Sequence, residues 1–205
     1  MRGIRFCDEL PFAYSWLVEE PATRTSHVLA SDGRMWFVDP LDWAPALDRA
    51  QALGTPAAVV QLLDRHTRDC AEIAKRLGVP HLVVPDEIAS SPFACVPVVR
   101  VRGWRETALW WPETRTLVVA EAIGGNRFFR AGDEPVGVHL LLRPRPPRRL
   151  AAYEPEHLLL GHGEGVHGEA AAAALREAVA TARRRLPRAL LQAPAFALDA
   201  VRRRR

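Results

Sequence analysis

The clearest pattern in the chain lies between Pro56 and Pro80, where an apolar run leads into a polar turn and then into helical spacing. The run Ala57–Leu63 predicts a buried strand, and the polar segment Asp64–Arg68 predicts a turn. The apolar positions that follow recur with the period of a helix: Cys70, Ile73, Ala74 and Leu77. Because open α/β sheets place their sites at the carboxyl ends of strands, this stretch predicts polar side chains at such an edge.

Capping residues give the expected limits of the helices. Asp69 and Glu72 are spaced as a capping box at the start of the helix just described, and Gly78 followed by Pro80 is typical of its end. An earlier helix is expected between a cap at Asp42 and a stop at Gly54. Its apolar face is Trp43, Leu47, Ala50 and Leu53.

The remaining apolar runs predict strands at both ends of the chain and one more helix, Glu169–Leu186, which Pro187 ends. The predicted strands are Tyr14–Glu19, Ser26–Ala30, Arg34–Asp39, His81–Val84, Ala94–Val101, Thr107–Trp111, Thr116–Glu121, Val136–Leu142 and His157–Leu160. A β-meander that gives way to alternating strands and helices favours sheets backed by helices over an all-β sandwich. We expect one domain over residues 1–187 and a basic C-terminal tail over residues 188–205.

Composition narrows the classes of function. The net charge of +4 comes almost entirely from arginine, but no aromatic residues interleave with the arginine clusters to stack bases, so nucleic acid is not an expected partner. No apolar stretch reaches the roughly 20 residues that span a bilayer, and the N-terminus does not resemble a signal peptide, so we expect a cytoplasmic protein without a membrane partner. Three cysteines without a CxxC pair indicate neither a disulfide framework nor a thiolate zinc site.

Four segments follow one another in an order that resembles one known protein superfamily. Met35–Pro40 resembles the strand whose final aspartate precedes the first helix, and Gln61–Pro80 occupies the place of the HxHxDH motif and its helix. Glu106–Glu121 resembles the hairpin that ends in the bridging aspartate, and Leu158–Gly168 resembles the loop with the last metal-binding histidine. The superfamily is that of the metallo-β-lactamases, so the resemblance implies an α/β protein with the metallo-β-lactamase-like four-layer αββα sandwich.

The residues at the metal-binding positions depart from the pattern of the family. Gln61, Leu63, Arg65 and His66 fall on HxHxDH, so only the last histidine is kept, and the segment expected to carry the middle histidine has none. Glu121 stands at the bridging aspartate, and His162 matches the last ligand. The resemblance therefore leaves at most His66, Glu121 and His162 as metal ligands, and Arg65 is expected to pair with Glu121.

Two functions follow from this site. The first is a protein with a degenerate metal site and no cofactor, which does not hydrolyse but binds a small molecule or a protein partner; its polar lining would be Arg65, His66, Glu121 and His162. The second is a hydrolase of an ester, thioester or amide that keeps one zinc ion on His66, Glu121 and His162. A contact between Arg65 and Glu121 would weigh against the hydrolase, because the guanidinium would occupy the carboxylate that the metal needs.

Overall fold

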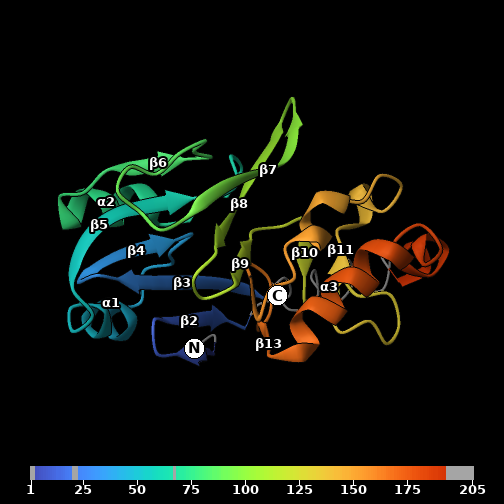
Figure 1. Ribbon diagram of the computed structural model, residues 1–205, viewed down its shortest axis with the longest axis horizontal. Coiled ribbons are helices and arrows are strands. Elements are labelled where there is room, and N and C mark those ends of the chain that lie inside the picture. Colours follow the sequence, from blue (N-terminus) through green and yellow to red (C-terminus); the bar gives the residue numbers. More distant parts are fainter. Residues whose placement is uncertain (1–2, 20–22, 67, 193–205) are drawn as a thin grey trace, which may run out of the picture.

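The computed structural model describes residues 3–19, 23–66 and 68–192 of the 205-residue chain. They form two large β-sheets with helices on their outer sides, and a small two-stranded sheet (Figure 1). None of the helices among these residues is long and apolar enough to cross a membrane.

The first sheet has the strand order β1-β2-β3-β4-β5-β6. The strands are β1 Ile4–Leu10, β2 Ala13–Val18, β3 Arg24–Ser31, β4 Arg34–Val38, β5 Thr55–Gln61 and β6 His81–Val83. The first four pair antiparallel, while β4, β5 and β6 run parallel because helices connect them. These helices, α1 Ala44–Ala50 and α2 Cys70–Leu77, bury their apolar sides with Tyr14, Trp16 and Phe37 of the sheet.

The second sheet has the order β13-β12-β9-β8-β7 and pairs antiparallel except between β9 and β12. The strands are β7 Ala94–Val101, β8 Trp104–Trp111, β9 Thr116–Val119, β12 His157–Leu160 and β13 Val166–His167. Helix α3, Glu169–Thr181, packs Leu175 and Val179 into the apolar cluster on this sheet. Between β9 and β12 the chain forms a small ladder of β10 Ile123–Gly124 with β11 Gly137–Val138, then the 3₁₀ turns η1 Leu140–Leu142 and η2 Arg148–Ala152.

A third apolar cluster joins the two sheets. Trp36 and Val60 of the first sheet lie in one cluster with Leu109, Val118 and Leu159 of the second. Three clusters therefore separate four layers in the order helix, sheet, sheet, helix, which confirms the predicted αββα sandwich.

Several local predictions were wrong for identifiable reasons. The segment Val136–Leu142 is not a strand: only β11 pairs, and η1 follows because the His139 side chain accepts a hydrogen bond from the Leu141 N–H. Asp69 is the N-cap residue of α2, as predicted, but its side chain makes no capping hydrogen bond and instead accepts the Asp42 N–H at 2.7 Å. Asp42 does not cap α1, because its carboxylate pairs with Arg76 at 2.8 and 2.9 Å.

The ends of the chain also differ from the predictions. Strand β1 was not predicted at all. Helix α3 stops at Thr181 rather than at Leu186, and residues 186–192 form a further helical segment. Most of the predicted basic tail, residues 193–205, lies outside the described residues.

Candidate functional site

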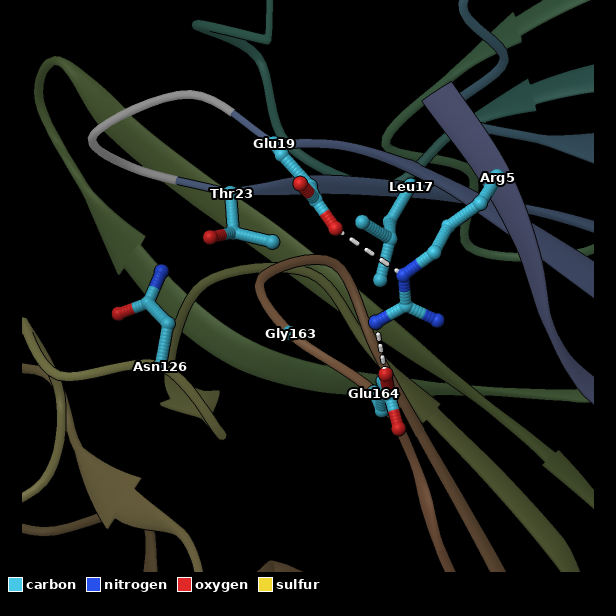
Figure 2. Close-up of a pocket in the computed structure, with 7 residues that line it drawn as sticks. All are labelled: Arg5, Leu17, Glu19, Thr23, Asn126, Gly163 and Glu164. Atoms are coloured by element: carbon cyan, nitrogen blue, oxygen red, sulfur yellow. Dashed lines mark hydrogen bonds and ion pairs between the residues drawn. The ribbon is translucent and has the colours of Figure 1, made fainter. Parts of the chain in front are cut away.

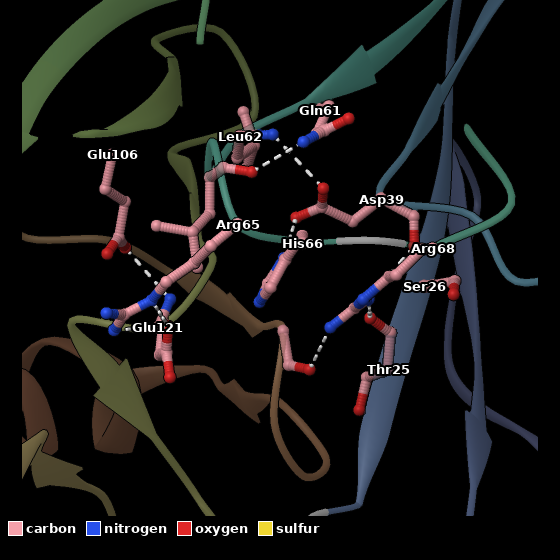
Figure 3. A network of polar contacts seen from close by, with 12 residues as sticks. Thr25, Ser26, Asp39, Gln61, Leu62, Arg65, His66, Arg68, Glu106 and Glu121 are labelled. Atoms are coloured by element: carbon pink, nitrogen blue, oxygen red, sulfur yellow. Dashed lines mark hydrogen bonds and ion pairs between the residues drawn. The ribbon is translucent and has the colours of Figure 1, made fainter. Parts of the chain in front are cut away.

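The candidate site lies at the carboxyl ends of two pairs of parallel strands, one pair in each sheet (Figure 3). The pairs are β4 with β5 and β9 with β12. Asp39 follows β4, the turn with Arg65 and His66 follows β5, Glu121 follows β9, and His162 follows β12. The chain after β5 also reaches the second sheet, because Thr107 of β8 donates its N–H to the Leu62 carbonyl at 2.9 Å. The strand ends therefore bring together residues that are up to 123 positions apart in the sequence.

Arg65 and Glu121 form the ion pair that the sequence predicts. Nη2 and Nε of Arg65 lie 3.0 and 3.2 Å from Oε2 of Glu121, and the guanidinium carbon stands 4.0 Å from the centre of the Trp104 ring. Burial acts to raise the pKa of Glu121, but Arg65, His139 and His162 outweigh it and hold this pKa below its ordinary value. Glu121 is therefore an ionised carboxylate whose main charge partner is a guanidinium.

His66 is held by a buried carboxylate. Its Nδ1 lies 3.0 Å from Oδ2 of Asp39, whose Oδ1 accepts the Leu62 N–H at 3.1 Å. Burial acts to raise the pKa of Asp39, but His66 and Arg68 more than offset it, so this pKa is lowered. The Nε2 atom of His66 is buried and has no hydrogen-bond partner among the described residues.

Arg68, which the sequence analysis did not single out, ties the strand ends to one another. Its guanidinium donates to the carbonyls of Thr25, Asp39 and Gly161, the last two at 2.9 Å. These carbonyls come from β3, the end of β4 and the end of β12. One arginine thus connects the two sheets beside His66.

His162 faces His66 across the gap between the sheets. The two ring centres are 5.6 Å apart, and the centre of the Phe129 ring lies 5.2 Å from that of His162. Nδ1 of His162 lies 3.1 Å from the Thr23 carbonyl oxygen. All four residues predicted from the sequence therefore lie in one cluster.

Two further members were missed. Glu106 is fully buried, and its Oε1 accepts the N–H groups of Glu121 and Ala122, each at 2.9 Å; burial raises its pKa to about 7. His139, which carries no motif, places Nε2 3.7 Å from Oε1 of Glu121. The only feature of the sequence that could have indicated Glu106 was a carboxylate at a strand position that is otherwise buried. No feature of the sequence indicated His139.

A pocket of about 390 Å³ lies beside the His162 loop (Figure 2). Arg5 reaches across it from β1, with Nε 3.1 Å from Glu19 and Nη2 bonded to Glu164. The other lining residues are Leu17, Thr23, Asn126 and Gly163. Two of the lining residues flank His162. Gly163 follows it in sequence, and the carbonyl oxygen of Thr23 contacts its Nδ1.

The side chains at the motif positions are not those of a metal centre. Among the described residues, no three His, Cys, Asp or Glu side chains are arranged to hold a metal ion. Gln61 lies at the first motif position, and its amide donates to the Leu63 carbonyl at 2.8 Å; Leu63 itself is buried in the core between the sheets. Arg65 places a cation at the third position.

Comparisons with known proteins support the fold. The chain matches no protein-family model and no curated protein. Among solved structures, it matches VMB-1 at pH 5.5 with a TM-score of 0.60 and 8% identity, over 89% of this chain and 99% of that one. It matches the DIM-1 metallo-β-lactamase with a TM-score of 0.55 and 14% identity, over 87% and 98% of the two chains. The structure of DIM-1 exposed to ceftazidime matches with a TM-score of 0.51 and 13% identity, over 87% of this chain and 97% of that one. The chain has the metallo-β-lactamase-like fold.

Proposed function

We propose that this protein uses the metallo-β-lactamase-like fold as a binding module. In this proposal its metal site is degenerate, it does not hydrolyse, and it binds a small molecule or a protein partner at the former active site. The lining is Arg65, His66, Glu121 and His162.

The observation that carries the proposal is the contact between Arg65 and Glu121. A divalent metal needs an available carboxylate, but Nε and Nη2 of Arg65 both donate to Oε2 of Glu121, and the guanidinium is held in place over Trp104. A guanidinium stays protonated at any physiological pH, so it repels a metal ion permanently. With Gln61 and Leu63 at two ligand positions, the residues present do not fit a two-metal centre.

The same arrangement can hold a ligand. The Arg65 side chain is 40% exposed, and its Nη1 makes no hydrogen bond to the described residues, so it can donate to a carbonyl or carboxylate. His66 offers a buried Nε2 that has no hydrogen-bond partner among the described residues. Trp104 and Phe129 supply apolar walls, as in most small-molecule sites.

A second candidate is a hydrolase that keeps one metal ion. What favours it is the clustering of His66, His162 and Glu121, since two histidines and one glutamate are an allowed set for catalytic zinc. It requires that Arg65 leave Glu121.

Metal content separates the two candidates. The protein is purified without chelator or affinity tag, and its zinc, manganese and iron are measured beside those of Glu121→Ala, with Glu113→Ala as a control on another glutamate. We expect less than about 0.1 equivalent of metal in all three and no turnover of ester, thioester or amide substrates. About one equivalent that is lost only in Glu121→Ala, together with turnover, would refute the binding module and support the hydrolase.

A further inference from the structure

An arginine patch lies far along the chain from the candidate site. Three of its members lie in and just before η2, and three lie beyond Thr181, the last residue of α3. All six are exposed and form no ion pair with a carboxylate of the described residues: Arg145, Arg148, Arg149, Arg183, Arg184 and Arg188. Because the net charge of the whole chain is only +4, the positive charge is concentrated in this patch.

A buried ion-pair network holds the two segments of the patch together. Nη2 of Arg143 lies 2.7 Å from Oε2 of Glu134, and Nε of Arg185 lies 3.6 Å from Oε1 of the same glutamate. The segments also touch directly, because Nε of Arg183 donates to the Pro144 carbonyl at 2.8 Å. The end of α3 and the chain before β12 therefore lie side by side at one end of the molecule (Figure 1).

The acidic residues next to the patch are already paired. Arg185 places Nη1 2.9 Å from Asp133 and Nη2 2.6 Å from Glu177, and Glu134 is fully buried. The arginines that point inward thus neutralise these carboxylates, while the arginines of the patch face solvent without a countercharge. Such a surface attracts an anionic partner.

Two apolar side chains lie beside this charge. Leu190 and Leu191 follow Arg188 in the helical segment 186–192, and their side chains are 53% and 82% exposed. Leu191 is the most exposed large apolar residue in the part of the chain that the structure describes. Exposed leucines next to arginines are typical of helices that lie on a lipid surface, where the apolar side chains enter the headgroup boundary.

The composition of the patch favours lipid over nucleic acid. Residues 141–149 and 182–192 contain no Phe, Tyr or Trp that could stack on bases. Clusters of about four to eight basic residues are typical of surfaces that bind anionic headgroups. The expectation of no membrane partner followed from the lack of a spanning segment and of a signal peptide, and a surface contact requires neither.

We propose that the arginine patch, together with Leu190 and Leu191, docks this protein on a membrane surface rich in anionic lipid. The arginines bind the headgroups, and the two leucines enter the boundary between headgroups and acyl chains. This contact goes beyond the proposed function and uses none of the residues that line the former active site.

The test is sedimentation of the full chain with lipid vesicles. We expect binding to phosphatidylcholine vesicles that contain about one third phosphatidylserine, little binding to phosphatidylcholine alone, and loss of binding between about 0.1 and 0.5 M NaCl. The patch variant changes Arg145, Arg148 and Arg183 to glutamine and should bind roughly 100-fold more weakly, about 5-fold for each arginine. Leu190→Ser combined with Leu191→Ser should weaken binding by at least about 10-fold.

A matched control removes the same charge from exposed positions elsewhere. It changes Arg76, Arg102 and Arg105 to glutamine and should weaken binding by less than about 5-fold. Circular dichroism checks that each variant is folded, which glutamine at an exposed position is expected to preserve. A second control changes Arg202–Arg205 to glutamine, so that the charge of the C-terminal tail is separated from that of the patch.

Four results would overturn the proposal. They are equal binding to both kinds of vesicle, equal losses in the patch and control variants, unchanged binding by the leucine variant, and binding that survives in the patch variant but is lost in the tail variant. Single-stranded RNA of about 20 nucleotides tests the competing partner. If the wild type binds this RNA but not the vesicles, and the patch variant loses the RNA, the patch serves nucleic acid and the assignment to lipid is wrong.

Discussion

His27 is predicted to make the stability of the fold depend on pH. It lies directly opposite Ser15 in the pairing of β2 with β3, with Nδ1 2.7 Å from the Ser15 hydroxyl, and its side chain is 1% exposed. Burial lowers the pKa of His27 from 6.5 to about 4, although Asp8 and Asp39 act to raise it. The folded protein therefore needs this imidazole to be neutral.

The sign and size of the effect follow from proton linkage. Between about pH 6.5 and pH 4 the unfolded chain binds a proton at His27 and the folded chain does not, so stability falls as the pH falls through this window. A difference of about 2.5 pKa units at about 1.36 kcal/mol each corresponds to about 3 kcal/mol at pH 4. Above about pH 7 both states are neutral, and the contribution of His27 is constant.

The variant His27→Asn isolates the pH-dependent contribution of His27 to stability. An amide can still meet the Ser15 hydroxyl but does not titrate, and the smaller side chain is expected to cost about 1–2 kcal/mol at pH 7.5. Urea unfolding is followed by circular dichroism from pH 7.5 to 4.5. The difference in unfolding free energy between wild type and His27→Asn should shrink as the pH falls and change sign near about pH 5. Ser15→Ala, which removes the partner but keeps the imidazole, should retain the wild-type slope. Parallel stability curves for wild type and His27→Asn would refute this account.

Two further predictions concern stability and can be measured by urea unfolding at one pH. Gly54→Ala should destabilise the fold by about 2–4 kcal/mol, because the backbone has φ +143° and the new Cβ would lie 2.2 Å from a backbone oxygen; Gly78→Ala, at φ +67° with open space, should cost only about 1 kcal/mol. Equal costs would contradict the steric argument. Glu134→Gln should cost about 3–5 kcal/mol because it leaves Arg143, 2.7 Å away and fully buried, without its countercharge. Glu154→Gln, in an exposed pair, should cost less than about 1 kcal/mol, and a similar loss in both would show that burial does not decide the effect.

Local patterns predicted most of the fold because they report burial directly. The continuous apolar run of β5 and the helical spacing of Cys70, Ile73 and Ala74 both correspond to buried faces. Strand β1 was missed because Ile4–Leu10 alternates weakly at the edge of its sheet, with only one of these residues, Cys7, buried. The caps of α2 at Asp69 and Gly78 were predicted correctly, but the carboxylates of Asp42 and Asp69 make tertiary contacts instead of capping hydrogen bonds, which spacing along the chain does not encode.

The candidate site was predictable only where the resemblance supplied positions. Arg65 and Glu121 are 56 residues apart, and only their matching places in the family's pattern suggested that they meet. Glu106 and His139 approach Glu121 from a strand and a turn that carry no such pattern. Long-range polar contacts depend on the relative placement of two sheets, which periodicity does not specify.

Two arginines connect the two sheets at the site. Arg65 connects the end of β5 to the end of β9 through Glu121, and Arg68 connects β3 and β4 to β12 through three carbonyls. A metal ion held between the same strand ends would join them by bridging side chains from both sheets. Because these guanidiniums make the link from within the chain, the arrangement does not depend on an added cation.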